Sequence, residues 1–189
     1  MNRHVLFVQG AGRSAHDAWD RKLVDSLRRE LGPGSEILYP RLPHEEEPSY
    51  ARWQPVLARE LAALPEGAVV MGHSVGGTIL VHALAAAPPT HAPAAIILLA
   101  APFVGEGGWP RQDVPALPDL GKRLPRASRV LLYQGDADET VPPAHVDLYA
   151  AAIPQATVRR LPGRNHQLND SLAEVAADLR DLRGSSAGR

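Results

Sequence analysis

Residues 68–77 read Ala68-Val69-Val70-Met71-Gly72-His73-Ser74-Val75-Gly76-Gly77. The first four are apolar, which predicts a buried strand, and the turn that follows matches the pattern G-x-S-x-G with Ser74 at its centre. A sharp turn from a strand into a helix needs small residues on both sides of the serine, and Gly72 and Gly76 provide them. The pattern indicates a hydroxyl group that projects from the end of a sheet. The alternative is a glycine-rich turn in which Ser74 only caps a helix.

Strand-like and helix-like segments alternate on both sides of this turn. Such alternation is typical of a parallel sheet covered by helices on both faces. We therefore expect an α/β fold, a three-layer α/β/α sandwich with a mostly parallel sheet of about six strands. One domain is expected over residues 1–183, followed by a disordered tail at 184–189. The expected strands are 4–8, 36–39, 68–71, 94–100 (central), 129–133 and 157–161 (at an edge), and the expected helices are 19–31, 50–64, 74–87, 143–153 and 172–182.

Composition narrows the range of functions. The 189 residues carry 20 Lys+Arg and 21 Asp+Glu, a formal net charge of -1, so a nucleic-acid partner is not expected. The absence of cysteine excludes disulfides, thiolate metal sites and a cysteine nucleophile. The longest apolar stretch, 92–104, is too short to span a membrane and contains two prolines, so no membrane partner is expected.

The start of the chain runs directly into the first expected strand, without the apolar region of a secretory signal. We therefore expect a cytoplasmic protein. Nearly all basic residues are arginine, and alanine and proline are abundant, which favours a bacterial source with a G+C-rich genome.

A carboxylic acid and a base are expected in later loops at the same edge of the sheet, because active sites of parallel sheets lie beyond the carboxyl ends of the strands. Gln134-Gly135-Asp136-Ala137-Asp138-Glu139 follows the fifth strand. We favour Asp138 because it lies well within the loop, with Asp136 and Glu139 as alternatives. The expected base is His166, in the loop after the sixth strand. Its alternative interpretation is a histidine on a surface loop.

These residues predict nucleophilic catalysis. His166 would take the proton of Ser74 as the serine attacks an acyl carbon, and Asp138 would hold the imidazole in the required tautomer. Two backbone N–H groups would bind the developing oxyanion. One belongs to Val75, the residue after the nucleophile, and the other to Ala11, in the loop after the first strand.

With these motifs in this order, the chain resembles the α/β-hydrolases over about residues 3–183. More narrowly, it is similar to the small single-domain serine hydrolases grouped with the retinoblastoma-binding serine hydrolase. The resemblance implies a triad of Ser74, Asp138 and His166 and a minimal α/β-hydrolase fold without a large lid. The matching stretches are Leu6-Phe7-Val8-Gln9-Gly10, His16-Asp17-Ala18-Trp19, Gly72-His73-Ser74-Val75-Gly76, Gly135-Asp136-Ala137-Asp138-Glu139 and Gly163-Arg164-Asn165-His166-Gln167.

Two features depart from this pattern. Gln9-Gly10 stands where many α/β-hydrolases have His-Gly. This change leaves the backbone donors in place, but it can orient the loop differently. An L-x-C-x-E motif of the retinoblastoma-binding type is impossible without cysteine, so the family's name does not indicate a partner of this chain.

The leading hypothesis is a carboxylesterase that forms an acyl-enzyme with a small-molecule acyl substrate of small or medium size. No long apolar lid is visible, which argues against a lipase. His16, Phe103 and Trp109 are the candidate pocket residues, whereas Trp19 is expected in the core. The segment 102–125, rich in proline and glycine, is a candidate cover over the site.

Other functions stay open at this point. The same triad could cleave an amide or a peptide, or transfer an acyl group to an acceptor other than water. A catalytically silent binding module on this fold is the alternative from another functional class. Gly10-Ala11-Gly12 begins like a dinucleotide-binding loop, but no acidic partner for a ribose follows the second strand, so no cofactor is expected.

Overall fold

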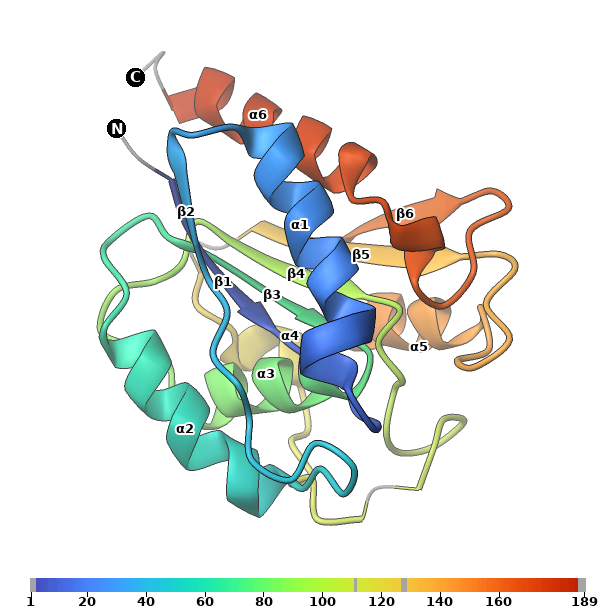
Figure 1. The fold of residues 1–189 in the computed structure, drawn as a ribbon. Coiled ribbons are helices and arrows are strands. Elements are labelled where there is room, and N and C mark those ends of the chain that lie inside the picture. Colours follow the sequence, from blue (N-terminus) through green and yellow to red (C-terminus); the bar gives the residue numbers. More distant parts are fainter. Residues whose placement is uncertain (1–2, 111, 127–128, 187–189) are drawn as a thin grey trace.

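The computed structural model describes residues 3–110, 112–126 and 129–186. Six strands form one sheet in the order β2-β1-β3-β4-β5-β6, with helices on both faces (Figure 1). This is the expected three-layer α/β/α sandwich, and every strand pair is parallel. The strands are β1 (Arg3–Val8), β2 (Ser35–Leu38), β3 (Val69–His73), β4 (Ala95–Leu99), β5 (Arg129–Gly135) and β6 (Thr157–Leu161). The helices are α1 (Asp20–Leu31), α2 (Tyr50–Ala62), α3 (Val75–Ala86), α4 (Leu120–Arg123), α5 (His145–Ala152) and α6 (Ala173–Ser186), with short turns η1 (Ala15–Trp19) and η2 (Leu168–Asp170).

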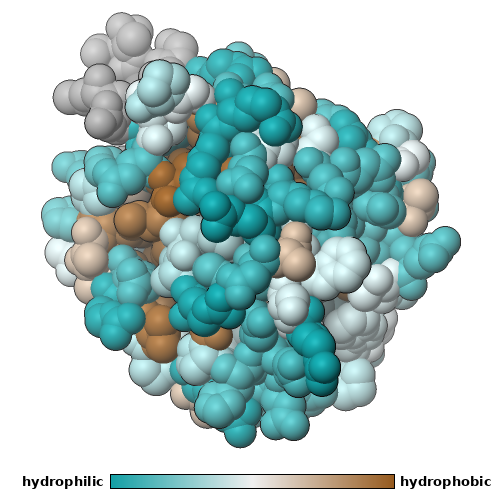
Figure 2. Space-filling view, viewed as in Figure 1, coloured by the Kyte–Doolittle hydropathy of each residue, from teal (hydrophilic) through white to brown (hydrophobic). Residues whose placement is uncertain are grey.

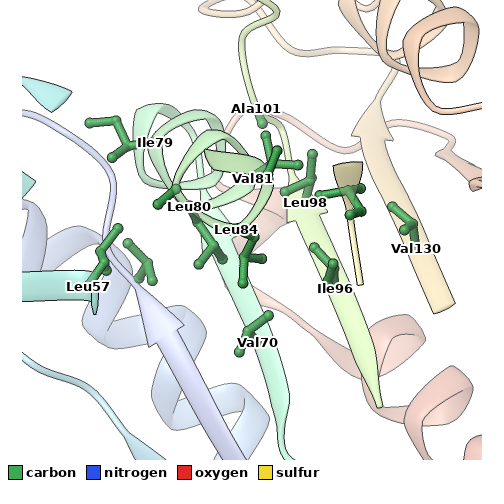
Figure 3. Packing of buried hydrophobic residues seen from close by; sticks show 14 of the residues in the cluster. Leu57, Val70, Ile79, Leu80, Val81, Leu84, Ile96, Leu98, Ala101 and Val130 are labelled. Atoms are coloured by element: carbon green, nitrogen blue, oxygen red, sulfur yellow. The ribbon is translucent and has the colours of Figure 1, made fainter. Parts of the chain in front are cut away.

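Side chains of the strands alternate between two apolar cores, one on each face of the sheet. Val70 and Leu98 face α3, where they pack with residues such as Leu84 (Figure 3). Their neighbours along the same strands, Met71 and Leu99, belong to the opposite core, which α1 and α6 cover. Each such fully buried side chain stabilises the fold by roughly 1.5–3 kcal/mol. β4 is buried along its whole length, as expected of a central strand, and β6 lies at an edge.

The outer surfaces of α1 and α6 are polar. Figure 2 shows hydrophilic side chains over most of the face that these helices occupy. In α1 the apolar residues Leu23 and Leu27 are buried, whereas Lys22 and Arg28 are exposed. The helix is therefore amphipathic, with its apolar stripe on the sheet. Among the described residues, no helix is both long and apolar enough to cross a membrane.

Two expectations at the helix ends need correction. Trp19 is 52% exposed and does not belong to the core. Residues 15–19 form a π-helical turn, and α1 begins only at Asp20, so Trp19 does not share the apolar stripe of Leu23 and Leu27. At the other end of the chain, α6 includes residues 184–186, which the sequence placed in a tail, and residues 187–189 lie outside the described part of the chain.

The start of α3 lies unusually close to the end of β1. A Cβ atom placed on Gly76 would come within 2.0 Å of the carbonyl oxygen of Gln9. A Cβ atom on Gly77 would lie 2.7 Å from the carbonyl oxygen of Gly72. Both neighbours are backbone atoms that cannot rotate away, so only glycine permits this approach. The approach brings the turn between β3 and α3 against the loop that follows β1.

We predict that Gly76→Ala destabilises the fold by at least about 2 kcal/mol, because the added methyl group must push β1 and α3 apart. The measurement is the free energy of unfolding in urea. Gly34→Ala is the matched control, since a Cβ atom there meets nothing within 4 Å. Equal stabilities of the two variants would contradict the packing argument.

Candidate active site

Ser74 occupies a strained turn between β3 and α3. Its backbone angles are φ 52° and ψ −133°, in a region that side-chain-bearing residues rarely adopt. Such a conformation costs of order 1–3 kcal/mol and persists only where the surroundings impose it. Here the Ser74 amide donates to the carbonyl of Leu99 at 2.8 Å, which fixes the turn to the end of β4. The sequence therefore predicted the turn at G-x-S-x-G correctly.

The structure brings Ser74, Asp138 and His166 together at the carboxyl ends of the strands. Nε2 of His166 lies 3.1 Å from Oγ of Ser74. Nδ1 of the same ring lies 2.9 Å from Oδ2 of Asp138. The three residues come from the loops after β3, β5 and β6, which meet because all strands run in the same direction.

Hydrogen bonds from its own loop and from Gln134 stabilise the ionised carboxylate of Asp138. Its Oδ1 accepts hydrogen bonds from the amides of Thr140 and Val141, both at 2.9 Å, and its Oδ2 accepts one from Nε2 of Gln134 at 2.8 Å. Burial opposes the charge, but the hydrogen bonds from His166 and from the two amides outweigh it, so the pKa of Asp138 lies below its ordinary value. The carboxylate therefore stays charged beside the imidazole at neutral pH.

The two alternative acids do not reach the imidazole. Asp136 is exposed, and its Oδ1 accepts a hydrogen bond from the amide of Gly163 at 2.6 Å. Its carboxylate thus joins the loops after β5 and β6. Glu139 is also exposed. Among the three carboxylates of this loop, only Asp138 contacts His166 in the described structure.

Ala11 and Val75 line the same cavity of about 230 Å³ as Ser74 and His166. Within the described part of the chain, neither amide donates a hydrogen bond to a protein atom. The adjacent amides are occupied, because Gly10 donates to the Asp20 carboxylate and Ser74 donates to Leu99. The two N–H groups that the sequence selected therefore lie beside the hydroxyl without a protein acceptor in the described structure.

Of the three residues expected in the pocket, only Trp109 lines the cavity at Ser74. His16 stacks on the ring of Tyr39 with centroids 4.2 Å apart, and its Nδ1 lies 2.8 Å from the Asp17 carboxylate. Phe103 packs against Tyr149 and lines a different cavity, beside α4 and α5. Trp19, which was expected in the core, lines the cavity at Ser74.

A second cavity of about 440 Å³ adjoins the first and shares Val75 and Trp109 with it. Its wall comes from the start of α2, from α3 and from the segment after β4. That segment is part of the stretch 102–125 that the sequence indicated as a cover. The lining residues are Glu47, Pro48, Ser49, Tyr50, Val75, Thr78, Ile79, Pro102, Val104, Trp109, Pro110, Gln112, Asp113 and Val114.

His145 holds the segment that carries Trp109. The amide of Phe103 donates to Nδ1 of His145 at 2.9 Å, and the ring of His145 lies edge-on to Trp109 with centroids 5.9 Å apart. Nδ1 can accept this hydrogen bond only when the imidazole is neutral. Burial lowers the pKa of His145, against an opposing effect of the Asp138 charge, so the neutral form is favoured.

The model of the alpha/beta hydrolase family matches residues 5–184. This chain belongs to that family. The match confirms the family that the motifs indicated, whereas the narrower grouping with the retinoblastoma-binding serine hydrolases stays a prediction.

Solved structures resemble this α/β-hydrolase over almost its full length. The ydeN gene product from B. subtilis has a TM-score of 0.78 at 18% identity, and the alignment covers 97% of this chain and 100% of that chain. XC6422 from Xanthomonas campestris, described as a serine hydrolase without lid, has a TM-score of 0.61 at 21% identity, and the alignment covers 95% of this chain and 79% of that chain. The esterase domain of a Rhodothermus marinus protein has a TM-score of 0.62 at 18% identity, and the alignment covers 98% of this chain and 86% of that chain. In sequence, no curated protein matches the chain.

We predict that His145→Phe removes a contribution to stability that depends on pH. Because the pKa of His145 is lowered in the folded state, this contribution is complete above the unfolded value of about 6.5 and is lost as the pH falls through the folded value. Urea unfolding of both proteins, from about pH 7.5 down to about pH 5, measures the difference. A stability difference that stays constant over this range would contradict the neutral hydrogen bond to Phe103.

Proposed function

We propose that this α/β-hydrolase is a serine hydrolase that cleaves carboxylic esters with small or medium acyl groups. Membership of the family supports a hydrolase. One observation carries the serine mechanism: the hydroxyl of Ser74, the two ring nitrogens of His166 and the carboxylate of Asp138 form a continuous chain of hydrogen bonds. The likeness to an esterase domain supports an ester as substrate.

The reaction begins when Oγ of Ser74 attacks the acyl carbon and its proton moves to Nε2 of His166. The carbonyl oxygen becomes an oxyanion, and the amides of Ala11 and Val75 donate to it. When the tetrahedral intermediate collapses, the bond to the alcohol breaks and Nε2 returns the proton to the leaving oxygen. A water molecule then attacks the acyl-enzyme by the same steps, which releases the acid and restores Ser74.

Two features of the fold stabilise the charges of this cycle. α3 begins at Val75, so the positive end of its helix dipole lies at the oxyanion. Asp138 faces Nδ1 of His166 with a full negative charge, which stabilises the imidazolium that forms during the attack. Neither feature has to rearrange during the reaction.

The two adjoining cavities set the expected size of the substrate. The ester group fits beside Ser74 in the smaller cavity, and the acyl chain extends past Val75 and Trp109 into the larger one. Val75, Ile79 and Val114 provide apolar surface along this path. Glu47 and Asp113 also line the larger cavity, which disfavours acyl chains that end in a carboxylate.

We predict that Ser74→Ala abolishes labelling by a fluorophosphonate probe and hydrolysis of p-nitrophenyl butyrate. Asp138→Asn should lower kcat by about 10³–10⁴-fold, because the amide can no longer hold the productive tautomer of His166. Asp136→Asn is the matched control, since it changes an exposed carboxylate of the same loop and should leave kcat within about twofold. Labelling that persists in Ser74→Ala, or its complete absence in the wild type, would refute the serine mechanism.

We also predict an optimum of kcat/KM between butyryl and octanoyl in a series of p-nitrophenyl esters. Each methylene group buried in the larger cavity contributes about 0.8 kcal/mol, roughly a fourfold gain per group. Val114→Phe should shift the optimum to shorter chains, because it fills the larger cavity without lining the smaller one. Aminoacyl amides in the same series test the amidase alternative. A fixed optimum in Val114→Phe would exclude this cavity as the acyl site.

A further inference from the structure

Beside the triad lies a second pair of carboxylate and imidazole, and it is almost completely buried. Asp20, the first residue of α1, and His73, the last residue of β3, are each 1% exposed. Oδ1 of Asp20 lies 2.8 Å from Nδ1 of His73. The reaction proposed above uses neither side chain. Removing two ionisable groups from water is costly, so their presence behind the nucleophile calls for a reason.

The remaining atoms of this pair bind the two loops that flank Ser74. Oδ2 of Asp20 accepts a hydrogen bond from the amide of Gly10 at 2.6 Å, immediately before the amide of Ala11. Nε2 of His73 donates to the backbone carbonyl of His166 at 3.0 Å. The rings of His73 and His166 lie 4.9 Å apart between centroids. The Asp20–His73 pair therefore connects three segments: the loop after β1 that carries Ala11, the turn at Ser74 and the loop that carries His166.

We propose that Asp20 and His73 are positioning residues, which hold the Ala11 amide and the ring of His166 at the distances from Ser74 that the reaction requires. This inference rests on the proposed serine mechanism and adds to it. Asp20 fixes the loop after β1 by accepting from Gly10, which leaves the next amide free to face the oxyanion. His73 fixes the backbone of His166, and Asp138 holds the imidazole at Nδ1.

The charges around His73 fit this role. Burial alone would lower the pKa of His73, but Asp20 opposes that effect, helped by the carbonyl of His166 and the charge of Asp138, and the pKa is raised. In a protonated ring, Nε2 donates to the carbonyl of His166, and Nδ1 lies at an ion-pair distance of 2.8 Å from Oδ1 of Asp20.

Three variants test the proposal. Asp20→Asn keeps the shape of the side chain, and its amide can serve both Gly10 and His73, so kcat should stay within about threefold. The double variant Asp20→Leu/His73→Phe removes both contacts and both charges together. Because it leaves no buried charge unpaired, it should still fold, although the amide of Gly10 and the carbonyl of His166 each lose a hydrogen-bond partner. Its kcat should nevertheless fall by about 10–100-fold, with KM changed by less than about threefold.

Ser26→Ala is the matched control on the same helix. Ser26 is 1% exposed, its Oγ accepts a hydrogen bond from the amide of Leu172, and neither residue lines the cavity at Ser74. This variant should lose stability and keep its kcat. The concentration of reactive enzyme in each preparation is measured by labelling with a fluorophosphonate probe until no further protein reacts. Each kcat is calculated from that concentration, so that unfolded protein does not lower it. A double variant with wild-type kcat, or an Asp20→Asn variant as slow as the double variant, would overturn the positioning role.

Nitrogen NMR of the histidine rings separates this inference from the proposed function. In the wild type, the pKa of His73 should lie above the ordinary histidine value of about 6.5, and Asp20→Asn should lower it. This measurement needs no substrate. A wild type that labels with no probe refutes the serine mechanism, whereas a His73 pKa that Asp20→Asn leaves unchanged refutes the Asp20–His73 pair.

Discussion

The contact between Gly76 and the carbonyl of Gln9 is the constraint on which the site depends. It brings the first turn of α3 against the end of β1, closer than any side chain would allow. Ser74 must then turn with a positive φ, which directs the helix start toward the loop after β1. Gly10 in that loop meets the turn in the same way, since a Cβ atom there would lie 3.1 Å from Cβ of Ser74. The hydroxyl and the amides of Ala11 and Val75 face one cavity because of these approaches.

The two pairs of carboxylate and imidazole are built alike and differ in their access to the cavity. Asp138 and Asp20 are both buried, and each accepts hydrogen bonds from backbone amides as well as facing a histidine. The side chain of His166 is 16% exposed and reaches Ser74, whereas that of His73 is 1% exposed and reaches a carbonyl. The same local chemistry thus leaves the imidazole of His166 open to the cavity and keeps that of His73 in the interior.

Most of the sheet, and the meeting of Ser74, Asp138 and His166 at one edge of it, could be predicted from the sequence, because both follow from local rules. A buried strand, a small-residue turn and a helix identify Ser74, and parallel strands bring Asp138 and His166 to the same edge. Asp20 gave no such signal, since an acidic residue at a helix start usually faces water and interacts with the helix dipole. Its burial depends on where α1 packs. Trp19 was wrongly expected in the core for a related reason. The π-helical turn at residues 15–19 changes the direction of its side chain, and the spacing of apolar residues alone does not reveal that turn.

Gln9 explains how the loop after β1 stays ordered with glutamine in a position where histidine is common in related sequences. Its side chain is completely buried and uses both ends, since Oε1 accepts from the amide of Leu42 and Nε2 donates to Glu45. Glu45 in turn accepts from the amide of His16, at the far end of the loop after β1. Residues 9–16 are therefore tied to the segment after β2 on one side and to Asp20 on the other. A loop fixed at both ends can present the Ala11 amide without a histidine in that position.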